Sequence, residues 1–242
     1  MNPFGDDIPR EQPAMDESSF DFSLVLERYH AHTEDCVVVP EGVTQILAAA
    51  FKGHDEIERI ELPESLESIG PGAFRDCVSL REIRIPDAVF EVGMRAFAGC
   101  RSLECVRLSN RLFSIDESTF AQCSKLRVVQ GGEDVDAIGA QAFLGCEMLT
   151  SLPFLAQVET LGGGALAGCA SFEEITLART MKRIGSEAFR SCRKLARVVM
   201  PETVESLGKN LFAGCFALQS VEGIEWLAEE FPTAFPFGMA KG

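Results

Sequence analysis

The side chains best suited to chemistry in this 242-residue chain are nine cysteines and three histidines. A cysteine thiolate becomes a strong nucleophile when a neighbouring histidine takes its proton. Cys36 and His54 form the best candidate pair for an enzyme of this kind, although no sequence motif joins them. An enzyme that uses Cys36 and His54 is therefore one alternative, and it predicts that the two side chains meet.

The other two histidines, His30 and His32, alternate in a segment that resembles a strand, so both would point to the same side. A zinc site needs three or four ligands at a recognisable spacing, and no third ligand follows at such a distance. We therefore interpret His30 and His32 as a surface pair, and we expect neither a metal nor another cofactor.

Most of the cysteines follow a repeat of 23 residues. They are Cys77, Cys100, Cys123, Cys146, Cys169, Cys192 and Cys215. Three residues before each lies a large apolar residue: Phe74, Phe97, Phe120, Phe143, Leu166, Phe189 or Phe212. One period earlier, Phe51 takes the apolar position and His54 the cysteine position. Such a period indicates a solenoid of about eight rungs, each rung being one 23-residue turn that must stack on its neighbours to bury its apolar face.

Stacking also explains why so many cysteines occur in one chain. Equivalent residues of adjacent rungs lie about 5 Å apart, so the cysteines form a straight ladder that cannot surround a metal ion. A free cysteine behaves as a small buried hydrophobic residue. We therefore predict that these thiols are structural.

Within one unit, apolar residues mark the positions that face inward. Between Cys77 and Cys100 they are Leu80, Ile83, Ile85, Val89, Val92, Ala96 and Phe97. The alternation at Ile83 and Ile85, followed by Pro86, predicts a short strand. Gly93 recurs in most units, which suggests a positive φ at that position, and Asp116 replaces it once. The segment 94–100 has the spacing of a short helical turn.

The combined pattern C-x-x-L-x-x-I-x-I-P-x-x-V-x-x-I-G-x-x-A-F resembles the BspA-like class of leucine-rich repeats. This resemblance implies an α/β fold: a curved leucine-rich-repeat solenoid with a parallel β-sheet on its concave face and short helical turns on the opposite side. It also implies a relation to surface proteins that bind other proteins or mediate adhesion.

The repeat divides the chain into three parts. We expect residues 1–22 to form an acidic, partly disordered leader and residues 23–223 to form the solenoid with its amino-terminal cap. Residues 224–242, which include Trp226, would form the carboxy-terminal cap and tail.

Charge and hydropathy restrict the possible partners. A net charge of −15 disfavours nucleic acid and anionic membranes, because both bind through clustered Lys and Arg. No apolar run reaches the length of about 18 residues that a membrane span needs. The amino terminus lacks the basic start and apolar stretch of a signal peptide, so we expect a cytoplasmic protein. A solenoid offers an extended surface in place of a deep pocket, and we expect no small-molecule substrate.

The residues that flank the inward positions of each strand must face out from the predicted concave sheet. They are most charged at the two ends of the array and least charged in the middle rungs. The residues that we predict to bind a partner are Arg84, Arg107, Val128, Gln130, Ser151 and Thr176. A solvated sheet without a partner would explain the same residues.

The two central units break the repeat. Gly131 and Gly132 replace the expected apolar residue and proline, and one unit later Phe154 and Leu155 follow Pro153. Either Phe154 or Leu155 points outward as a binding anchor, or the rung is locally bent.

These observations favour a non-enzymatic recognition module that binds an unknown protein or peptide on the concave sheet. The alternative that the resemblance suggests is an adhesin-like surface protein. A third alternative is the enzyme built on Cys36 and His54.

Overall fold

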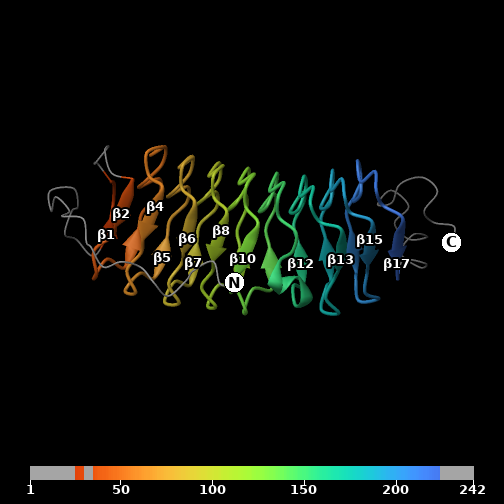
Figure 1. Ribbon diagram of the computed structural model, residues 1–242. Coiled ribbons are helices and arrows are strands. Elements are labelled where there is room, and N and C mark those ends of the chain that lie inside the picture. Colours follow the sequence, from red (N-terminus) through yellow and green to blue (C-terminus); the bar gives the residue numbers. More distant parts are fainter. Residues whose placement is uncertain (1–24, 30–34, 224–242) are drawn as a thin grey trace.

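The computed structural model describes residues 25–29 and 35–223. These residues form a solenoid of parallel strands, in which successive rungs stack in a single row (Figure 1). The predicted leader (1–22), the predicted carboxy-terminal cap (224–242), His30, His32 and Trp226 lie outside the described residues.

Each regular rung contributes one strand of three residues and one strand of two residues. The three-residue strands form what we call the long-strand face: β2 (Cys36–Val38), β4 (Arg59–Glu61), β6 (Glu82–Arg84), β8 (Cys105–Arg107), β10 (Val128–Gln130), β13 (Glu174–Thr176), β15 (Arg197–Val199) and β17 (Ser220–Glu222). This is the face that the sequence predicts to be concave.

The two-residue strands form a second row, the short-strand face. They are β1 (Val25–Leu26), β3 (Gln45–Ile46), β5 (Ser68–Ile69), β7 (Glu91–Val92), β9 (Ser114–Ile115), β11 (Ala137–Ile138), β12 (Thr160–Leu161), β14 (Arg183–Ile184) and β16 (Ser206–Leu207). The register confirms the period, because Val106 pairs with Val129 and Ile138 pairs with Leu161, each 23 residues apart.

The third side of each rung is a chain of turns, and the predicted helical turn there is wrong. Among the described residues the helix is η2 (Pro153–Ala156), a single 3-10 turn on another side of the coil. In the predicted helical segment, Cys100 donates its amide to the carbonyl of Phe97, but Phe97 donates its own amide to Thr119 of the next rung. Residues with positive φ, such as Arg95 at 59° and Gly99 at 80°, recur twice in each rung. A right-handed helix cannot continue through them.

The recurring glycine of the sequence pattern has a different role from the predicted one. Gly162 does not have a positive φ, but a Cβ atom there would lie 2.4 Å from the backbone nitrogen of Ala140 in the preceding rung. Gly93 is similar, since its Cβ would lie 2.7 Å from the nitrogen of Pro71. Glycine is needed at this position because two backbones approach closely.

The interior contains two ladders of side chains. The phenylalanine rings of neighbouring rungs stack from Phe51 to Phe143 with centroids 5.0 to 5.4 Å apart. Each repeat cysteine donates its S–H to a carbonyl oxygen 26 residues earlier, as Cys77 does to Phe51 at 3.0 Å. The predicted inward residues, from Leu80 to Cys100, are buried. This confirms the predicted solenoid core, which consists of one continuous apolar interior.

The ladder cysteines are free thiols, and burial raises the pKa of five of them: Cys77, Cys100, Cys123, Cys146 and Cys169. For Cys77 burial raises the pKa to about 12. A thiol that stays protonated at neutral pH is a poor nucleophile and a poor metal ligand. The ladder is therefore a packing device, as the sequence predicts.

Candidate functional site

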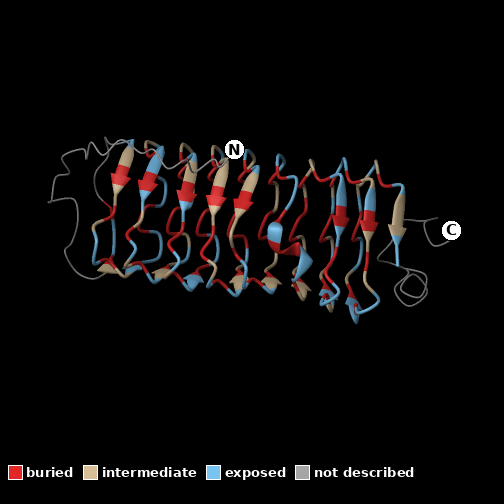
Figure 2. Cartoon of the chain, turned by 60° about the horizontal axis from the view of Figure 1, so that its bottom comes forward, coloured by how far each residue is buried: buried red, intermediate tan, exposed pale blue. Residues whose placement is uncertain are grey.

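The long-strand face is interrupted at its centre. Strand β10 ends one sheet of five strands and β13 begins another of three, with η2 in the rung between them (Figure 2). Within the described residues, no backbone hydrogen bond joins residues 149–156 to either neighbouring rung. Pro153 contributes to this break, because it has no N–H for a strand ladder and its fixed φ suits the first position of a helix.

The irregular residues on the two sides of this break fit each other. Gly131 and Gly132 both have positive φ, and a Cβ atom on Gly132 would lie 3.1 Å from the ring of Phe154. Phe154 therefore occupies space that the expected side chain would otherwise fill. Its ring lies 6.5 Å from that of Phe143, and Phe154 and Leu155 are both buried.

Of the two alternatives for this segment, an outward anchor at Phe154 or Leu155 is wrong. The locally bent rung is correct, and it has a physical reason. The next aromatic position of the repeat holds Leu166, which is smaller than phenylalanine, and the Phe154 ring extends the aromatic stack at that point.

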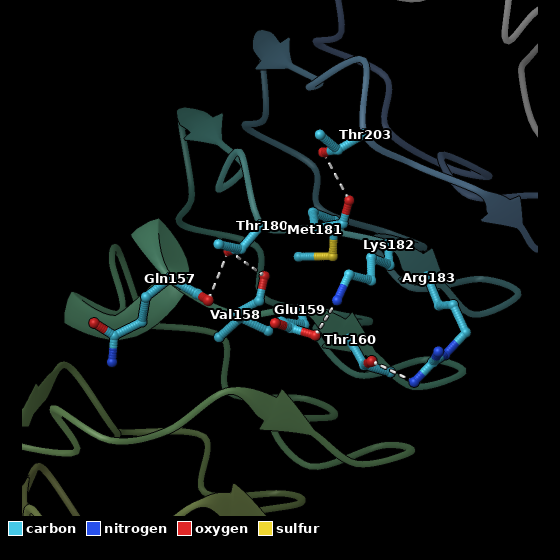
Figure 3. Close-up of polar contacts among 9 residues, drawn as sticks. All are labelled: Gln157, Val158, Glu159, Thr160, Thr180, Met181, Lys182, Arg183 and Thr203. Carbon is cyan, nitrogen blue, oxygen red and sulfur yellow. Dashed lines mark hydrogen bonds and ion pairs between the residues drawn. The ribbon is translucent and has the colours of Figure 1, made fainter.

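Side chains replace the missing backbone bonds around the break. The Nε2 atom of Gln157 donates to the carbonyls of Gly132, Glu133 and Val135 in the preceding rung. On the following rungs, Thr180 Oγ1 donates to the carbonyl of Gln157 at 2.8 Å and Thr203 Oγ1 to that of Met181 at 2.9 Å (Figure 3). The broken rung is thus held by its core and its turn.

Ionic contacts between rungs follow the same stack. Lys182 Nζ lies 2.7 Å from Glu159 Oε2, which raises the pKa of Lys182, and Arg183 donates to Thr160 Oγ1 at 3.1 Å (Figure 3). These pairs are exposed, so we expect each to contribute little stability.

Five of the six predicted binding residues lie on strands of the long-strand face. Arg84 and Arg107 belong to β6 and β8, Val128 and Gln130 to β10, and Thr176 to β13. Ser151 was predicted to lie on a strand, and this is wrong, because the rung of Pro153 has no three-residue strand. Ser151 is nevertheless exposed in the break between β10 and β13.

Charge divides the long-strand face into a centre and two flanks. The outward residues of the centre carry no charge, and we call them the uncharged centre: Cys105, Val128, Gln130, Ser151, Pro153 and Thr176.

The flanks are charged, but their arginines are paired within the chain. Arg84 pairs with Glu64, and Arg107 Nη2 lies 3.7 Å from Asp87. At the other end, Arg197 lies 2.6 Å from Glu174 and 2.7 Å from Glu222. Arg197 holds the pKa of Glu222 below its usual value. Sequence reasoning placed Arg84 and Arg107 at the site, but it could not foresee that both already have acidic partners.

The structure gives no support to the pairing of Cys36 with His54. His54 is 9% exposed, its Nδ1 lies 2.6 Å from Glu56 Oε1, and its ring packs edge-on against Tyr29. Cys36 lies at the start of β2. It borders a shallow polar hollow on the long-strand face, and the lining of that hollow includes Glu58 and Arg59 but not His54.

Comparison with known proteins now decides the family. The repeat family described as "BspA type Leucine rich repeat region (6 copies)" matches residues 44–171 and 129–229, which together make up most of the chain. This protein belongs to the BspA-type leucine-rich repeat family. No curated protein matches the chain.

Solved structures of bacterial leucine-rich repeat proteins are similar to this BspA-type solenoid. One is a leucine-rich cell surface protein from Faecalibacterium prausnitzii, with 25% identity and a TM-score of 0.54 over 78% of this chain and 59% of that one. Another is a leucine-rich repeat protein from Eubacterium ventriosum, with 20% identity and a TM-score of 0.58 over 90% of this chain and 49% of that one. The chain therefore spans between half and three fifths of these neighbours.

Within residues 25–29 and 35–223, the structure contains no helix that is long and apolar enough to cross a membrane.

Proposed function

We propose that this BspA-type protein is a recognition module that binds a protein or peptide through the uncharged centre of its long-strand face. Solenoids of stacked repeats commonly bind partners on the extended surface that their strands create. The uncharged centre contains four of the six predicted residues, Val128, Gln130, Ser151 and Thr176, and Arg84 and Arg107 belong to the charged flank beside it.

One observation carries the proposal. The uncharged centre lies between two flanks whose arginines are neutralised by Glu64, Asp87, Glu174 and Glu222. Protein interfaces have this layout, in which residues without charge lie at the centre and polar or charged residues form a rim. Because the rim charges are already paired with each other, they can stay in contact with water when a partner covers the centre. They also orient a partner whose charges are complementary.

The break at the rung of Pro153 also supports the proposal that the long-strand face binds a partner. A regular sheet presents a uniform pleated surface, whereas here Ser151 and Pro153 are exposed between the edges of β10 and β13. Among the described rungs this shape occurs once, because the other interior strands of the long-strand face have a strand neighbour on both sides. A partner that recognises it would select a single position on an otherwise repetitive surface.

The test is capture of a partner from extracts of the cells that make the protein, measured by quantitative mass spectrometry. The test variant carries Val128→Asp and Thr176→Asp, which place charge in the uncharged centre. The matched control carries Ala137→Asp and Ser206→Asp at outward strand positions of the short-strand face.

We expect wild type and the control to enrich the same protein and the test variant to lose it. Charge buried without a partner at an interface costs several kcal/mol, so the loss should be at least tenfold. Equal capture by all three, or enrichment of nothing, would refute the proposal.

A second candidate is an adhesin-like surface protein. The neighbour from Faecalibacterium prausnitzii is called a cell surface protein, and that name supports this alternative to the predicted cytoplasmic location. Protease added to intact producing cells would separate the two: digestion of the protein supports a surface role, and protection supports the cytoplasmic one.

A further inference from the structure

A second surface with features of a binding site lies on the short-strand face. Phe90, Met94 and Phe113 are 47%, 46% and 65% exposed, and we call them the aromatic patch. Phe90 and Phe113 hold the same position of consecutive rungs. In the other rungs that position is polar or charged: Thr44, Glu67, Asp136, Glu159, Lys182 and Glu205. Clustered apolar side chains on a surface commonly mark an interaction site.

The aromatic patch coincides with a break in the short-strand ladder. Strand β7 ends one sheet and β9 begins the next, although they belong to consecutive rungs. Asp116 causes the break, because it stands where neighbouring rungs have glycines that touch the preceding backbone. In the described part of the chain, neither Phe113 nor Asp116 donates its amide to the preceding rung, whereas Phe90 and Gly139 both do.

Carboxylates border the patch along its own ladder. The amide of Phe90 bonds to the carbonyl of Glu67, and the amide of Asp136 bonds to that of Phe113, so Glu67 and Asp136 are the immediate neighbours of the two rings. Glu67, Glu91 and Asp136 are exposed, and none of the ion pairs among the described residues involves them.

One charged pair and one further cation lie beside the patch. Glu117 is paired with Arg95 at 3.2 Å. Arg111 is exposed and its guanidinium donates to the carbonyl of Ala88, so this one cation faces the three carboxylates of the border. The border is therefore negative overall.

This charge restricts what can cover the patch. A second copy of the chain, with its net charge of −15, would bring like charges together. The acidic leader is unfavourable for the same reason, and anionic lipid would also be repelled.

We propose that the aromatic patch binds a basic amphipathic segment of another protein, whose apolar side chains cover Phe90 and Phe113 and whose Lys or Arg residues pair with Glu67 and Asp136. Amphipathic segments bind in this way when an apolar stripe meets an apolar surface and charges on the two rims match. This surface is separate from the uncharged centre, and the inference holds whether or not the proposed function does.

The test uses a fluorescent synthetic amphipathic peptide of leucine, phenylalanine and lysine as its probe, with binding measured by anisotropy at 150 mM salt. A second peptide has the same apolar residues but glutamate in place of lysine. Vesicles that contain anionic lipid provide a third probe.

The first variant carries Phe90→Ser and Phe113→Ser, and its control carries Met148→Ser, another exposed apolar residue. The second variant carries Glu67→Gln and Asp136→Asn, and its control carries Glu173→Gln and Glu202→Gln. All these side chains are exposed, so we expect the variants to melt like wild type.

We expect the basic peptide to bind wild type and both controls, the aromatic variant to bind at least tenfold more weakly, and the charge variant about three- to tenfold more weakly. The acidic peptide should not bind. Equal binding by wild type and the aromatic variant would show only general attraction to an acidic protein and would overturn the proposal. Binding of vesicles in preference to the peptide, or no binding of the peptide, would overturn it as well.

Discussion

In the part of the solenoid that the structure describes, the two strand faces are each broken once, at different rungs and for different reasons. The long-strand face is broken at the rung of Pro153, where a 3-10 turn replaces a strand. The short-strand face is broken between β7 and β9, where Asp116 replaces a glycine that must touch the preceding backbone. In both places the interior stays filled, because the stack of phenylalanine rings continues past the short-strand break and Phe154 extends it at the long-strand break.

Packing of side chains in the interior therefore holds the rungs together, while the strand ladders at the surface can be interrupted locally. Each interruption leaves an irregular surface on a regular array. At the long-strand break that surface is uncharged, and at the short-strand break it is aromatic with an acidic border. Substitutions of interior residues should therefore affect stability most, and substitutions of exposed residues at the breaks should affect it least.

Alkaline pH should have the largest effect, because it acts on the interior cysteine ladder. Burial raises the pKa of Cys77, Cys100, Cys123, Cys146 and Cys169 above the value near 9 that holds in the unfolded chain. The unfolded state therefore loses protons first. The buried thiols contribute their full stabilisation below pH 9, and this contribution is lost as the pH rises toward 12. The free energy of unfolding should fall by about 1.4 kcal/mol per pH unit for each thiol, or about 7 kcal/mol per pH unit for the five.

Urea unfolding from pH 8 to pH 10.5 measures this effect. Cys123→Ala serves as the control, since removing one thiol should reduce the slope by about 1.4 kcal/mol per pH unit. A free energy of unfolding that does not change with pH across this range would show that the thiols are not buried as a ladder.

Truncation of Phe154 should have the next largest effect. Phe154→Ala should lower the free energy of unfolding by about 3 to 5 kcal/mol, and Phe143→Ala by a similar amount, because both rings are fully buried. Phe113→Ala is the matched control on an exposed ring and should cost less than about 0.5 kcal/mol. If Phe154→Ala proved as mild as Phe113→Ala, the ring would not close the core at the long-strand break.

A substitution at the recurring glycine should introduce a new break into the short-strand face. Gly162→Ala places a Cβ atom 2.4 Å from the backbone of Ala140 and should cost about 1 to 3 kcal/mol. Gly163→Ala is the control, because the nearest atom to its Cβ is 3.4 Å away. Chemical denaturation of the two variants gives the comparison, and equal stability would contradict the role assigned to the recurring glycine.

The substitution Asp116→Gly should close the existing break in the short-strand face. It should change the free energy of unfolding less than the substitutions in the interior. New bonds to the preceding rung are offset by the flexibility of glycine and by loss of the contact between Ser114 and Asp116, so we expect a net change within about 1 kcal/mol. Hydrogen exchange is the informative measurement. The amides of residues 113 and 116 should exchange more slowly in the variant, and unchanged exchange would show that Asp116 does not hold the ladder open.

The period alone predicts much of this fold, because a spacing of 23 residues determines which residues stack. The pairing of Val106 with Val129 and the buried positions from Leu80 to Cys100 follow from it. The aromatic patch was missed, but the same register contains the signal, since Phe90 and Phe113 occupy a position that is polar elsewhere.

Other features depend on contacts between rungs that no single unit contains. Phe154 points inward because Gly132, one rung earlier, leaves room for its ring. The recurring glycine was assigned a positive φ, whereas its real constraint comes from the neighbouring backbone. The pairing of Arg84 with Glu64 likewise joins different rungs, so the repeat predicts that Arg84 lies on the surface but not that Glu64 is its partner.

We propose above all that the uncharged centre of the long-strand face is the recognition surface. The most direct measurement is hydrogen exchange by mass spectrometry of the protein alone and in complex with the partner captured by wild type. We expect slower exchange on binding in residues 128–130, 150–157 and 174–176, with the short strands of the same rungs unchanged. Protection confined to other parts of the chain, with no change at β10, η2 and β13, would contradict the claim.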